Sequence, residues 1–242
     1  MKIFLDPEYE LARKQARKFA EEELRPAVRK YDEEETFPFD LWKRAAELGY
    51  TGLMIPEEYG GSGVDPLLAV IVSEEIARGF PAFGLSLGAH FLLCGYNIAR
   101  EGNEDQKRRY LPLLASGKAI GAMGLTEPGA GSDATGIKTT ARREGDYYIL
   151  NGTKTFITNA PIADIFFVYA KTSPEKGPHG ISAFIVERSF PGVSTSKPFK
   201  KMGNRASPTG EIYFNEARVP KENLVGEEDK GVYIMMRGLD IE

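Results

Sequence analysis

The sequence is poor in the residues that form disulfides and metal sites. Its 242 residues include one cysteine, Cys94, one tryptophan and two histidines. A single cysteine excludes an internal disulfide, which is typical of a reducing compartment, so we expect a cytoplasmic protein. The histidines, His90 and His179, lie far apart and show no spacing typical of zinc ligands. We therefore predict no metal site, with His90 in the core and His179 on the surface.

Long apolar runs and a strong charge of either sign are also missing. No apolar run approaches the roughly 20 residues of a membrane helix. The start, MKIFLDPEYE, has too short an apolar stretch for a signal peptide and is too acidic for a transit peptide. The net charge is only −4, whereas a nucleic-acid binder would show a basic face. With 42% hydrophobic and 27% charged residues, the composition is that of a globular protein with one large domain or two ordinary ones.

The first half of the chain has the spacing and the end signals of helices. Asp6-Pro7 is a helix start, and apolar residues then recur at helical spacing as far as Tyr31. Pro26 predicts a kink or a restart in that helix. Further helices are expected over residues 41–48, capped by Asp40, and over 66–78, 83–100 and 104–115. We therefore predict an N-terminal all-α domain over residues 1–117.

From residue 118 the residue types become those of strands. The run YYILNGTKTFIT surrounds Asn151-Gly152, a strong hairpin signal. Three more strands are expected over residues 164–170, 180–187 and 211–220. Residues 118–228 are therefore predicted to form an antiparallel β domain, a barrel or a sandwich.

The last stretch, residues 229–242, returns to helical spacing. Val232, Met235, Met236 and Leu239 form an apolar stripe, and Glu242 projects at its margin. No glycine or proline stops this helix, so we expect it to continue into a third domain that this chain lacks. The predicted fold class is α+β: a helical domain, an antiparallel β domain, and the first turns of a C-terminal helical bundle.

The most informative segment is GLTEPGAGSD, residues 124–133. Its turn residues predict a loop in which backbone N–H groups and the Ser132 hydroxyl surround a concavity, and such nests bind phosphate or pyrophosphate oxygens. Glycines at 129 and 131 permit close approach of a ligand. The spacing is not that of the GxGxxG dinucleotide motif. The alternative is an interdomain turn with Thr126 and Asp133 as local caps, and the residues alone leave both open.

This segment, extended to GLTEPGAGSDATG, resembles the flavin-loop signature of the acyl-CoA dehydrogenases. NGTKTFITNA (151–160) resembles the second flavin-contact segment of that family, and the resemblance runs through the whole chain. Other matching segments are GNEDQKRRYLP (102–112), GISAFIVE (180–187), KMGNRAS (201–207) and RVPKENLVG (218–226). The resemblance implies a helical domain, a middle β domain and a four-helix bundle. It also implies FAD, an acyl-CoA substrate, electron-transfer flavoprotein as acceptor, and a homotetramer at full length.

The resemblance gives several residues a role at the flavin. Met123, Leu125 and Thr126 match positions that lie along the flavin ring. Gly131 and Ser132 match positions at the FAD pyrophosphate, with Ser132 also facing the CoA. The resemblance therefore assigns this segment to the flavin ring and the pyrophosphate of FAD.

Two further positions come from the second segment. Thr158 matches the threonine near the reactive flavin nitrogen, and Phe156 stands where many members carry a tryptophan beside the flavin. Phenylalanine keeps the aromatic face and lacks the indole N–H donor. Without the resemblance, Phe156 would be predicted as an ordinary core residue of a strand.

The end of the sequence acquires a meaning from the same resemblance. The family reaction removes a proton from the carbon next to a thioester, so it needs a base, and a carboxylate in an apolar pocket is a stronger base. GLDIE (238–242) resembles the pattern of isovaleryl-type members, which implies Glu242 as the catalytic base and Asp240 as a contact to the CoA arm. From the residues alone, Glu242 is more simply a solvated charge.

The sequence therefore predicts a FAD-dependent enzyme that desaturates a short or branched acyl-CoA, similar to isovaleryl-CoA. Two alternatives stay open. One is an acyl-CoA oxidase or flavin monooxygenase on the same fold. The other is an inactive or partner-binding fragment, because half of the flavin site is expected beyond residue 242 and an apolar face would be left open.

Overall fold

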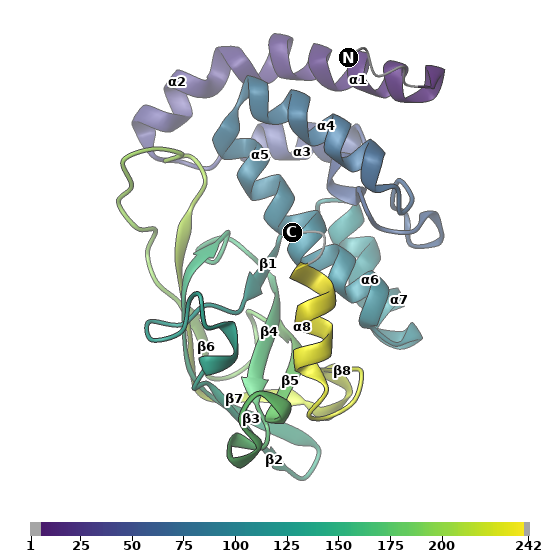
Figure 1. Cartoon of the computed structure of the whole chain (residues 1–242). Helices are drawn as coiled ribbons and strands as arrows, with labels where there is room; N and C mark the ends of the chain where they lie inside the picture. Colours follow the sequence, from purple (N-terminus) through teal and green to yellow (C-terminus); the bar gives the residue numbers. More distant parts are fainter. Residues whose placement is uncertain (1–5, 240–242) are drawn as a thin grey trace.

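The computed structural model describes residues 6–239. A group of helices lies on one end of a β-sheet, and the last helix runs beside the sheet toward the helices (Figure 1). This order of a helical part, a sheet and one returning helix agrees with the predicted fold class.

The helical half begins and breaks where the sequence predicts. Pro7 starts the first helix, and a π-helical segment, Ala20–Leu24, precedes the restart at Pro26. Asn103 and Gln106 form the capping box of the last helix in this half. The expected cap at Asp40 is wrong, because the helix there starts at Phe39, two residues earlier than predicted, and the Asp40 carboxylate accepts a hydrogen bond from Tyr31. The helices are α1 Pro7–Phe19, α2 Arg25–Glu34, α3 Phe39–Glu47, α4 Pro66–Gly79, α5 Pro81–Gly88, α6 Asn97–Glu101 and α7 Glu104–Ala115.

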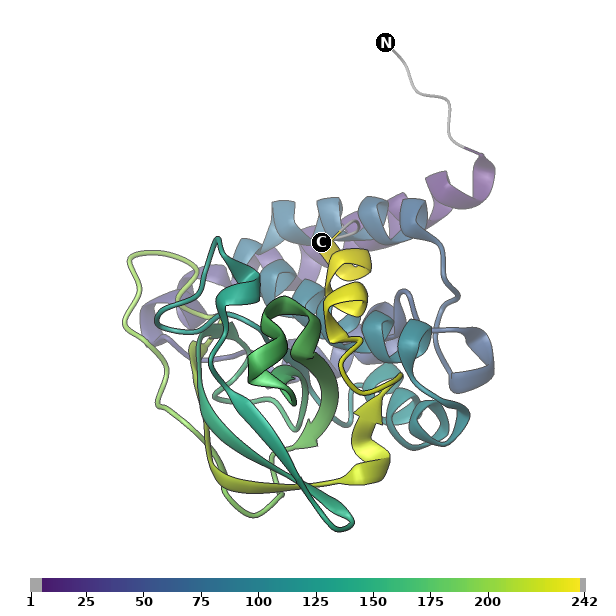
Figure 2. The same cartoon turned by 60° about the horizontal axis from the view of Figure 1, so that its bottom comes forward.

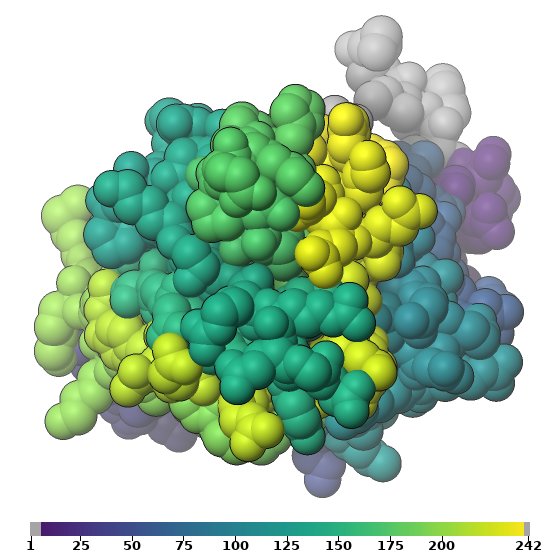
Figure 3. Space-filling model, turned by 90° about the horizontal axis from the view of Figure 1, so that it is seen from below, coloured from purple at the N-terminus to yellow at the C-terminus, as the bar shows by residue number. Residues whose placement is uncertain are grey.

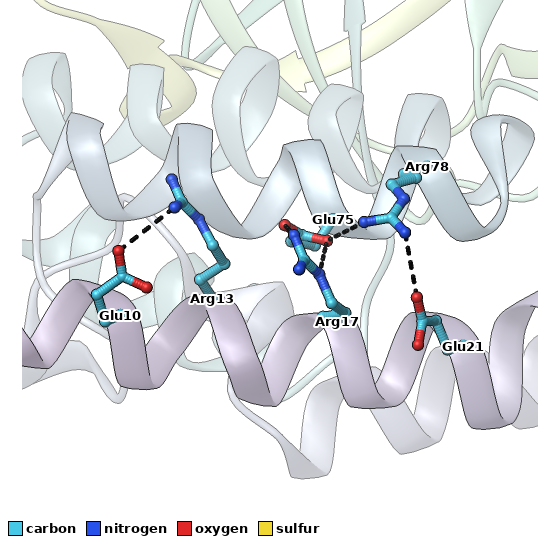
Figure 4. A network of polar contacts seen from close by, with 6 residues as sticks. All are labelled: Glu10, Arg13, Arg17, Glu21, Glu75 and Arg78. Atoms are coloured by element: carbon cyan, nitrogen blue, oxygen red, sulfur yellow. Dashed lines mark hydrogen bonds and ion pairs between the residues drawn. The ribbon is translucent and has the colours of Figure 1, made fainter. Parts of the chain in front are cut away.

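A buried carboxylate joins the first helix to α4 (Figure 4). Glu75 of α4 is 3% exposed, and its Oε2 lies 2.9 Å from Arg17 Nε of α1. Arg78 Nη1 lies 3.5 Å from the same oxygen, and Arg78 Nη2 lies 3.2 Å from Glu21 Oε1. Hydrogen bonding by Arg17 holds the pKa of Glu75 below its usual value, so the carboxylate is charged at neutral pH.

The second half forms one mixed sheet with the strand order β6-β7-β3-β2-β4-β5-β8. β1 lies off this path and pairs in parallel with β4. The sequence predicted an antiparallel domain, and this is wrong for β1, which makes the sheet mixed. β1 enters the sheet directly from the helical half rather than through a hairpin, so no local turn signal reveals its direction. The strands are β1 Gly121–Gly124, β2 Thr140–Glu144, β3 Tyr147–Thr158, β4 Ile165–Lys171, β5 Ile181–Glu187, β6 Val193–Thr195, β7 Thr209–Pro220 and β8 Leu224–Val225.

The hairpin predicted at Asn151-Gly152 is wrong. β3 runs through both residues as one strand, and its register with β7 shifts there in a β-bulge. Gly152 has φ 150°, and a Cβ atom on it would lie 2.8 Å from the Cα of Thr139. The glycine therefore serves a close approach of two backbones. The tight turn lies instead at Gly145-Asp146, between β2 and β3, where Gly145 has φ 61°.

A continuous rod of helix from Pro81 to Glu101 packs against β1 and β4 and is one of the contacts between the two halves. It contains the π-helical segment Ala89–Tyr96. Among the described residues it is the one helix long and apolar enough to cross a membrane, but 67% of its apolar window is buried inside the fold, as in a core helix. His90 on this rod is fully buried, as predicted, and His179 is exposed.

Helix α8, Gly231–Leu239, is tied to both halves. Before its start, the Asp229 carboxylate accepts hydrogen bonds from the Thr172 and Ser173 hydroxyls at 2.6 and 2.9 Å. Near its end, Arg237 Nη2 lies 2.7 Å from Glu101 Oε2 of α6. α8 (yellow) runs beside the segment Pro174–Gly180 (green) in Figure 2, and the two meet on the surface in Figure 3. These contacts hold the end of α8 near the place where the rod meets the sheet.

Candidate active site

One hollow between the rod and the sheet gathers the site residues predicted from the sequence. Its volume is about 370 Å³. All seven residues expected at the flavin line it, from β1, the loop that follows it and the end of β3. The lining residues are Ala89, Leu93, Met123, Leu125, Thr126, Gly131, Ser132, Ala134, Phe156, Ile157, Thr158 and Leu239.

A backbone distortion turns Phe156 into this hollow. Phe156 has φ 57°, in the left-handed region that costs an aromatic residue free energy. The register of β3 with β7 shifts between Lys154 and Ile157, so the normal alternation of the strand is lost there. The Phe156 side chain is 70% exposed, and its ring meets Phe199 edge-to-face with the centroids 5.8 Å apart. The interpretation of Phe156 as an ordinary core residue is therefore wrong.

The loop after β1 is folded around Glu127. Glu127 and Ala130 exchange two backbone hydrogen bonds of 3.0 Å, which close a tight turn. The Asp133 carboxylate accepts hydrogen bonds from the Gly136 N–H and the Thr135 hydroxyl, as the turn interpretation of this segment expected. A Cβ atom on Gly131 would meet nothing within 4 Å. The loop is thus capped locally and still leaves its backbone open to a ligand at Gly131.

A buried ion pair lies at the base of this loop, and the sequence interpretation missed it. Lys154 is 0% exposed, and its Nζ lies 2.7 Å from Glu127 Oε1. Burial lowers the pKa of Lys154 to about 8, against the opposing effect of Glu127. Burial by itself would raise the pKa of Glu127, but Lys154 holds it below its usual value. A lysine within an apolar strand could have indicated a buried charge. Its partner, however, lies 27 residues away in the sequence, so no local pattern identifies the pair.

The wall opposite the loop is apolar and was also missed. Ala89 and Leu93 belong to the π-helical segment of the rod, and π-segments often occur at functional sites. The sequence predicted only that this stretch is buried. Leu239 of α8 completes the wall and is the last described residue. Asp240 and Glu242, predicted as CoA contact and base, lie outside the described residues.

The chemistry of the lining is that of a binding surface. None of the described side chains that line the hollow is titratable, and Thr126, Ser132 and Thr158 supply hydroxyls. A mainly apolar concavity with a few polar groups suits a flat organic ligand. In the part of the chain that the structure describes, no group of three His, Cys, Asp or Glu residues is placed to hold a metal ion. A reaction that moves a proton here needs a base from outside this lining.

Family models match both halves of the chain. Residues 6–118 match the N-terminal domain of acyl-CoA dehydrogenase, and residues 122–217 match its middle domain. The chain belongs to the acyl-CoA dehydrogenase family. This is a family of flavin-dependent oxidoreductases that use FAD.

Known proteins resemble this chain in sequence and in structure. The chain is 47% identical over 242 residues to mitochondrial isovaleryl-CoA dehydrogenase of Pongo abelii, and the match covers 98% of this chain and 57% of the relative. Butyryl-CoA dehydrogenase of Megasphaera elsdenii is 40% identical with a TM-score of 0.94, covering 100% of this chain and 64% of that one. A chain in a structure of the electron transferring flavoprotein of Acidaminococcus fermentans is 42% identical with a TM-score of 0.95, covering 99% and 63%.

These comparisons confirm the predicted fold class. The chain spans about 57% of the length of the isovaleryl-CoA dehydrogenase relative and 63 to 64% of the two solved chains.

Proposed function

We propose that the protein dehydrogenates a short or branched acyl-CoA, such as isovaleryl-CoA, between its α and β carbons with FAD as the electron acceptor. One observation carries this proposal: all seven residues matched to flavin contacts line a single hollow. Two segments of the sequence supply them, residues 123–132 and 156–158, and the fold brings them together.

The residues around the hollow fit a flavin. Phe156 offers an exposed aromatic face at the cost of a strained backbone, which supports a role in ligand binding. Met123, Leu125, Thr126 and Thr158 would hold the ring. Gly131 and Ser132 would hold the pyrophosphate, where the loop backbone faces open space. FAD, when bound, supplies the acceptor for a hydride.

We propose Glu242 as the base that removes the α-proton, and Asp240 as a contact to the CoA arm. The hollow has no titratable side chain among its described lining residues, so the base must come from elsewhere. Leu239 lines the hollow, and Glu242 follows it three residues later in the sequence. The pattern GLDIE supports the same assignment.

The relatives support the substrate class and the electron acceptor. The isovaleryl-CoA dehydrogenase relative favours a branched acyl group, and the butyryl-CoA dehydrogenase favours a short one. The similarity to a chain from an electron transferring flavoprotein structure supports such a flavoprotein as the partner. We further propose a homotetramer for the full-length protein.

Reduction of the bound flavin tests the function. The purified protein should be yellow and should bleach when isovaleryl-CoA is added without oxygen. Glu242→Gln should keep its colour and slow the bleaching by roughly 10² to 10⁴-fold, the usual contribution of a general base. The exposed Glu222→Gln is the matched control and should bleach normally.

Three outcomes would contradict parts of the proposal. Colourless protein that takes up no FAD would support an inactive or partner-binding fragment. Normal bleaching by Glu242→Gln would exclude Glu242 as the base. Rapid oxidation of the reduced flavin by oxygen would identify an oxidase or a monooxygenase rather than a dehydrogenase.

A further inference from the structure

We propose that Lys154 is a positioning residue of the flavin site. Its buried ammonium, paired with Glu127, fixes the loop of residues 125–139 and strengthens the Thr126 N–H as a hydrogen-bond donor toward the hollow. This inference rests on the proposed function, because it takes FAD as the ligand in that hollow.

The ammonium makes two contacts inside the protein. Lys154 Nζ lies 2.7 Å from Glu127 Oε1 and 3.1 Å from the carbonyl oxygen of Leu125. Lys154 is 0% exposed and Glu127 is 7% exposed. Hydrogen bonds that involve charged groups are shorter and stronger than neutral ones, and water cannot compete for these. The position of the Leu125 carbonyl is therefore fixed by a charged donor.

Glu127 passes this constraint to the rest of the loop. Its carboxylate accepts hydrogen bonds from the Lys138 N–H at 2.6 Å and the Thr139 N–H at 3.0 Å. Its backbone closes the turn with Ala130. One ion pair therefore joins the end of β1, the tight turn, the start of β2 and the middle of β3.

The lining residues of the hollow surround this pair in the sequence. Leu125 is bonded to Lys154 directly, and Gly131 follows the turn that Glu127 closes. Phe156 lies two residues after Lys154 on β3. The Thr155 N–H donates to the Thr126 carbonyl at 2.9 Å, which fixes β3 against the loop. The pair thus sets the spacing between the two flavin segments.

The peptide group between Leu125 and Thr126 carries the polarising effect of the Lys154 ammonium to the Thr126 N–H. In a trans peptide the C=O and the N–H point in opposite directions, and the described chain has no cis peptide bonds. The Thr126 N–H therefore points away from Lys154, and Thr126 lines the hollow. A cation on the carbonyl polarises the peptide and makes its N–H a stronger donor. Such a donor stabilises a ligand that gains electron density, so reduced flavin is bound more tightly than oxidised flavin.

Stability alone does not account for this pair. Removing two charges from water costs several kcal/mol per ion by general estimates, and well-packed apolar residues are often as stable in the same place. A charged pair under a ligand hollow instead gives a fixed geometry and a fixed direction of charge. This is what a site that binds a redox cofactor requires.

The test compares flavin-loaded variants at pH 6, where Lys154 keeps its charge. We would measure the dissociation constant of FAD, the flavin midpoint potential against a reference dye, and the thermal unfolding of the FAD-free protein. Lys154→Met should weaken FAD binding and lower the preference for reduced flavin about tenfold, or about 30 mV for a two-electron couple. Lys154→Arg should restore most of that preference. The exposed Lys138→Met is the matched control in the same loop and should leave the potential unchanged.

Glu127→Asp separates an electrostatic role from a purely structural one. It shortens the link to the loop and keeps a charged partner beside the ammonium, so FAD binding should weaken while the potential does not fall. If Lys154→Met does not fold, the neutral Lys154→Gln takes its place. Potentials that fall in both Glu127→Asp and the neutral Lys154 variant, or that change in neither, overturn the inference while the wild type still binds FAD. A wild type that binds no FAD overturns the proposed function and the inference with it.

Discussion

Phe156 lies in a strand but has a left-handed backbone, which a regular strand does not allow. Its φ is 57° and its ring is 70% exposed, although it lies between Thr155 and Ile157, both of which are buried. A left-handed aromatic residue costs of order 1 to 3 kcal/mol. The fold retains this cost at the wall of the hollow, which is the place where a ligand would cover the ring.

Replacing Phe156 with glycine should separate stability from binding. Glycine tolerates the left-handed backbone but gives the unfolded chain more freedom, so we expect the free energy of unfolding to stay within about 1 kcal/mol of the wild type. FAD should bind at least about 10-fold more weakly, because the ring is lost. Urea unfolding and FAD titration measure the two effects. The exposed Phe39→Ala on α3 is the control for FAD binding, and equal losses in both variants would contradict the assignment.

His90 is a buried histidine, and both of its ring nitrogens have hydrogen-bond partners. The Gly121 N–H donates to Nδ1 at 2.9 Å, so Nε2 carries the proton and faces the carbonyls of Thr51 and Leu114 at 3.2 and 3.1 Å. These bonds tie the rod to β1 and to α7. Burial lowers the pKa of His90 to about 4, so the native ring is neutral at physiological pH.

This histidine predicts a loss of stability in acid. The unfolded chain takes up a proton near pH 6.5 and the folded chain only near pH 4, so stability falls between these values. The contribution of His90 is up to about 3 kcal/mol by linkage. Urea unfolding at a series of pH values should show a smaller slope in His90→Gln between pH 6.5 and 4. The exposed His179→Gln should keep the wild-type slope, and a His90→Gln slope equal to it would contradict the assignment.

At the scale of elements, α1 and α4 depend on one carboxylate. Glu75 is the only described acid that Arg17 and Arg78 share, and it is almost fully buried. Both arginine side chains are nearly half exposed, so water screens part of the attraction. The two arginines therefore stabilise the fold mainly through hydrogen bonds to the Glu75 carboxylate, which is charged and shielded from water.

Glu75→Gln should therefore destabilise the protein by roughly 1 to 3 kcal/mol, the cost of a buried hydrogen bond to a charged group. The control Glu33→Gln removes the exposed pair with Arg29 and should cost less than about 0.5 kcal/mol. Thermal unfolding of both variants measures the difference. A Glu75→Gln protein as stable as the control would show that apolar packing alone holds α1 on α4.

At the scale of the whole molecule, the segment between β6 and β7 reaches across to α2 (Figure 1). Arg205 donates from its backbone N–H and its guanidinium to Asp32 at 3.1 and 3.0 Å, and Lys200 lies 2.5 Å from Glu35. The same segment carries Phe199, which meets Phe156 at the hollow. The contacts of this segment with α2 therefore also affect the position of Phe199 beside the hollow. The domain boundaries at residues 117 and 228 stay predictions.

Loosening this contact should affect both the segment and the flavin. Asp32→Asn weakens charge-assisted bonds and is expected to cost about 1 to 2 kcal/mol. It should also increase proteolytic cleavage between residues 196 and 208 and weaken FAD binding a few-fold. Limited proteolysis with FAD titration tests this. Asp146→Asn, in an exposed pair with Lys221, is the control, and identical cleavage of the two variants would contradict the role of Asp32.

The helices, the family and seven of the residues that line the hollow could be predicted from the sequence. Helix starts such as Pro7 and the Asn103 cap are local, because they depend on φ and on hydrogen bonds to neighbouring residues. The flavin segments were found because their residues resemble those of a family. Tertiary contacts alone fixed the parallel pairing of β1, the bulge at Gly152, the turn of Phe156 toward the hollow and the burial of Lys154 against Glu127. Each of these depends on partners distant in the sequence, and a local pattern contains no information about what a distant strand brings beside it.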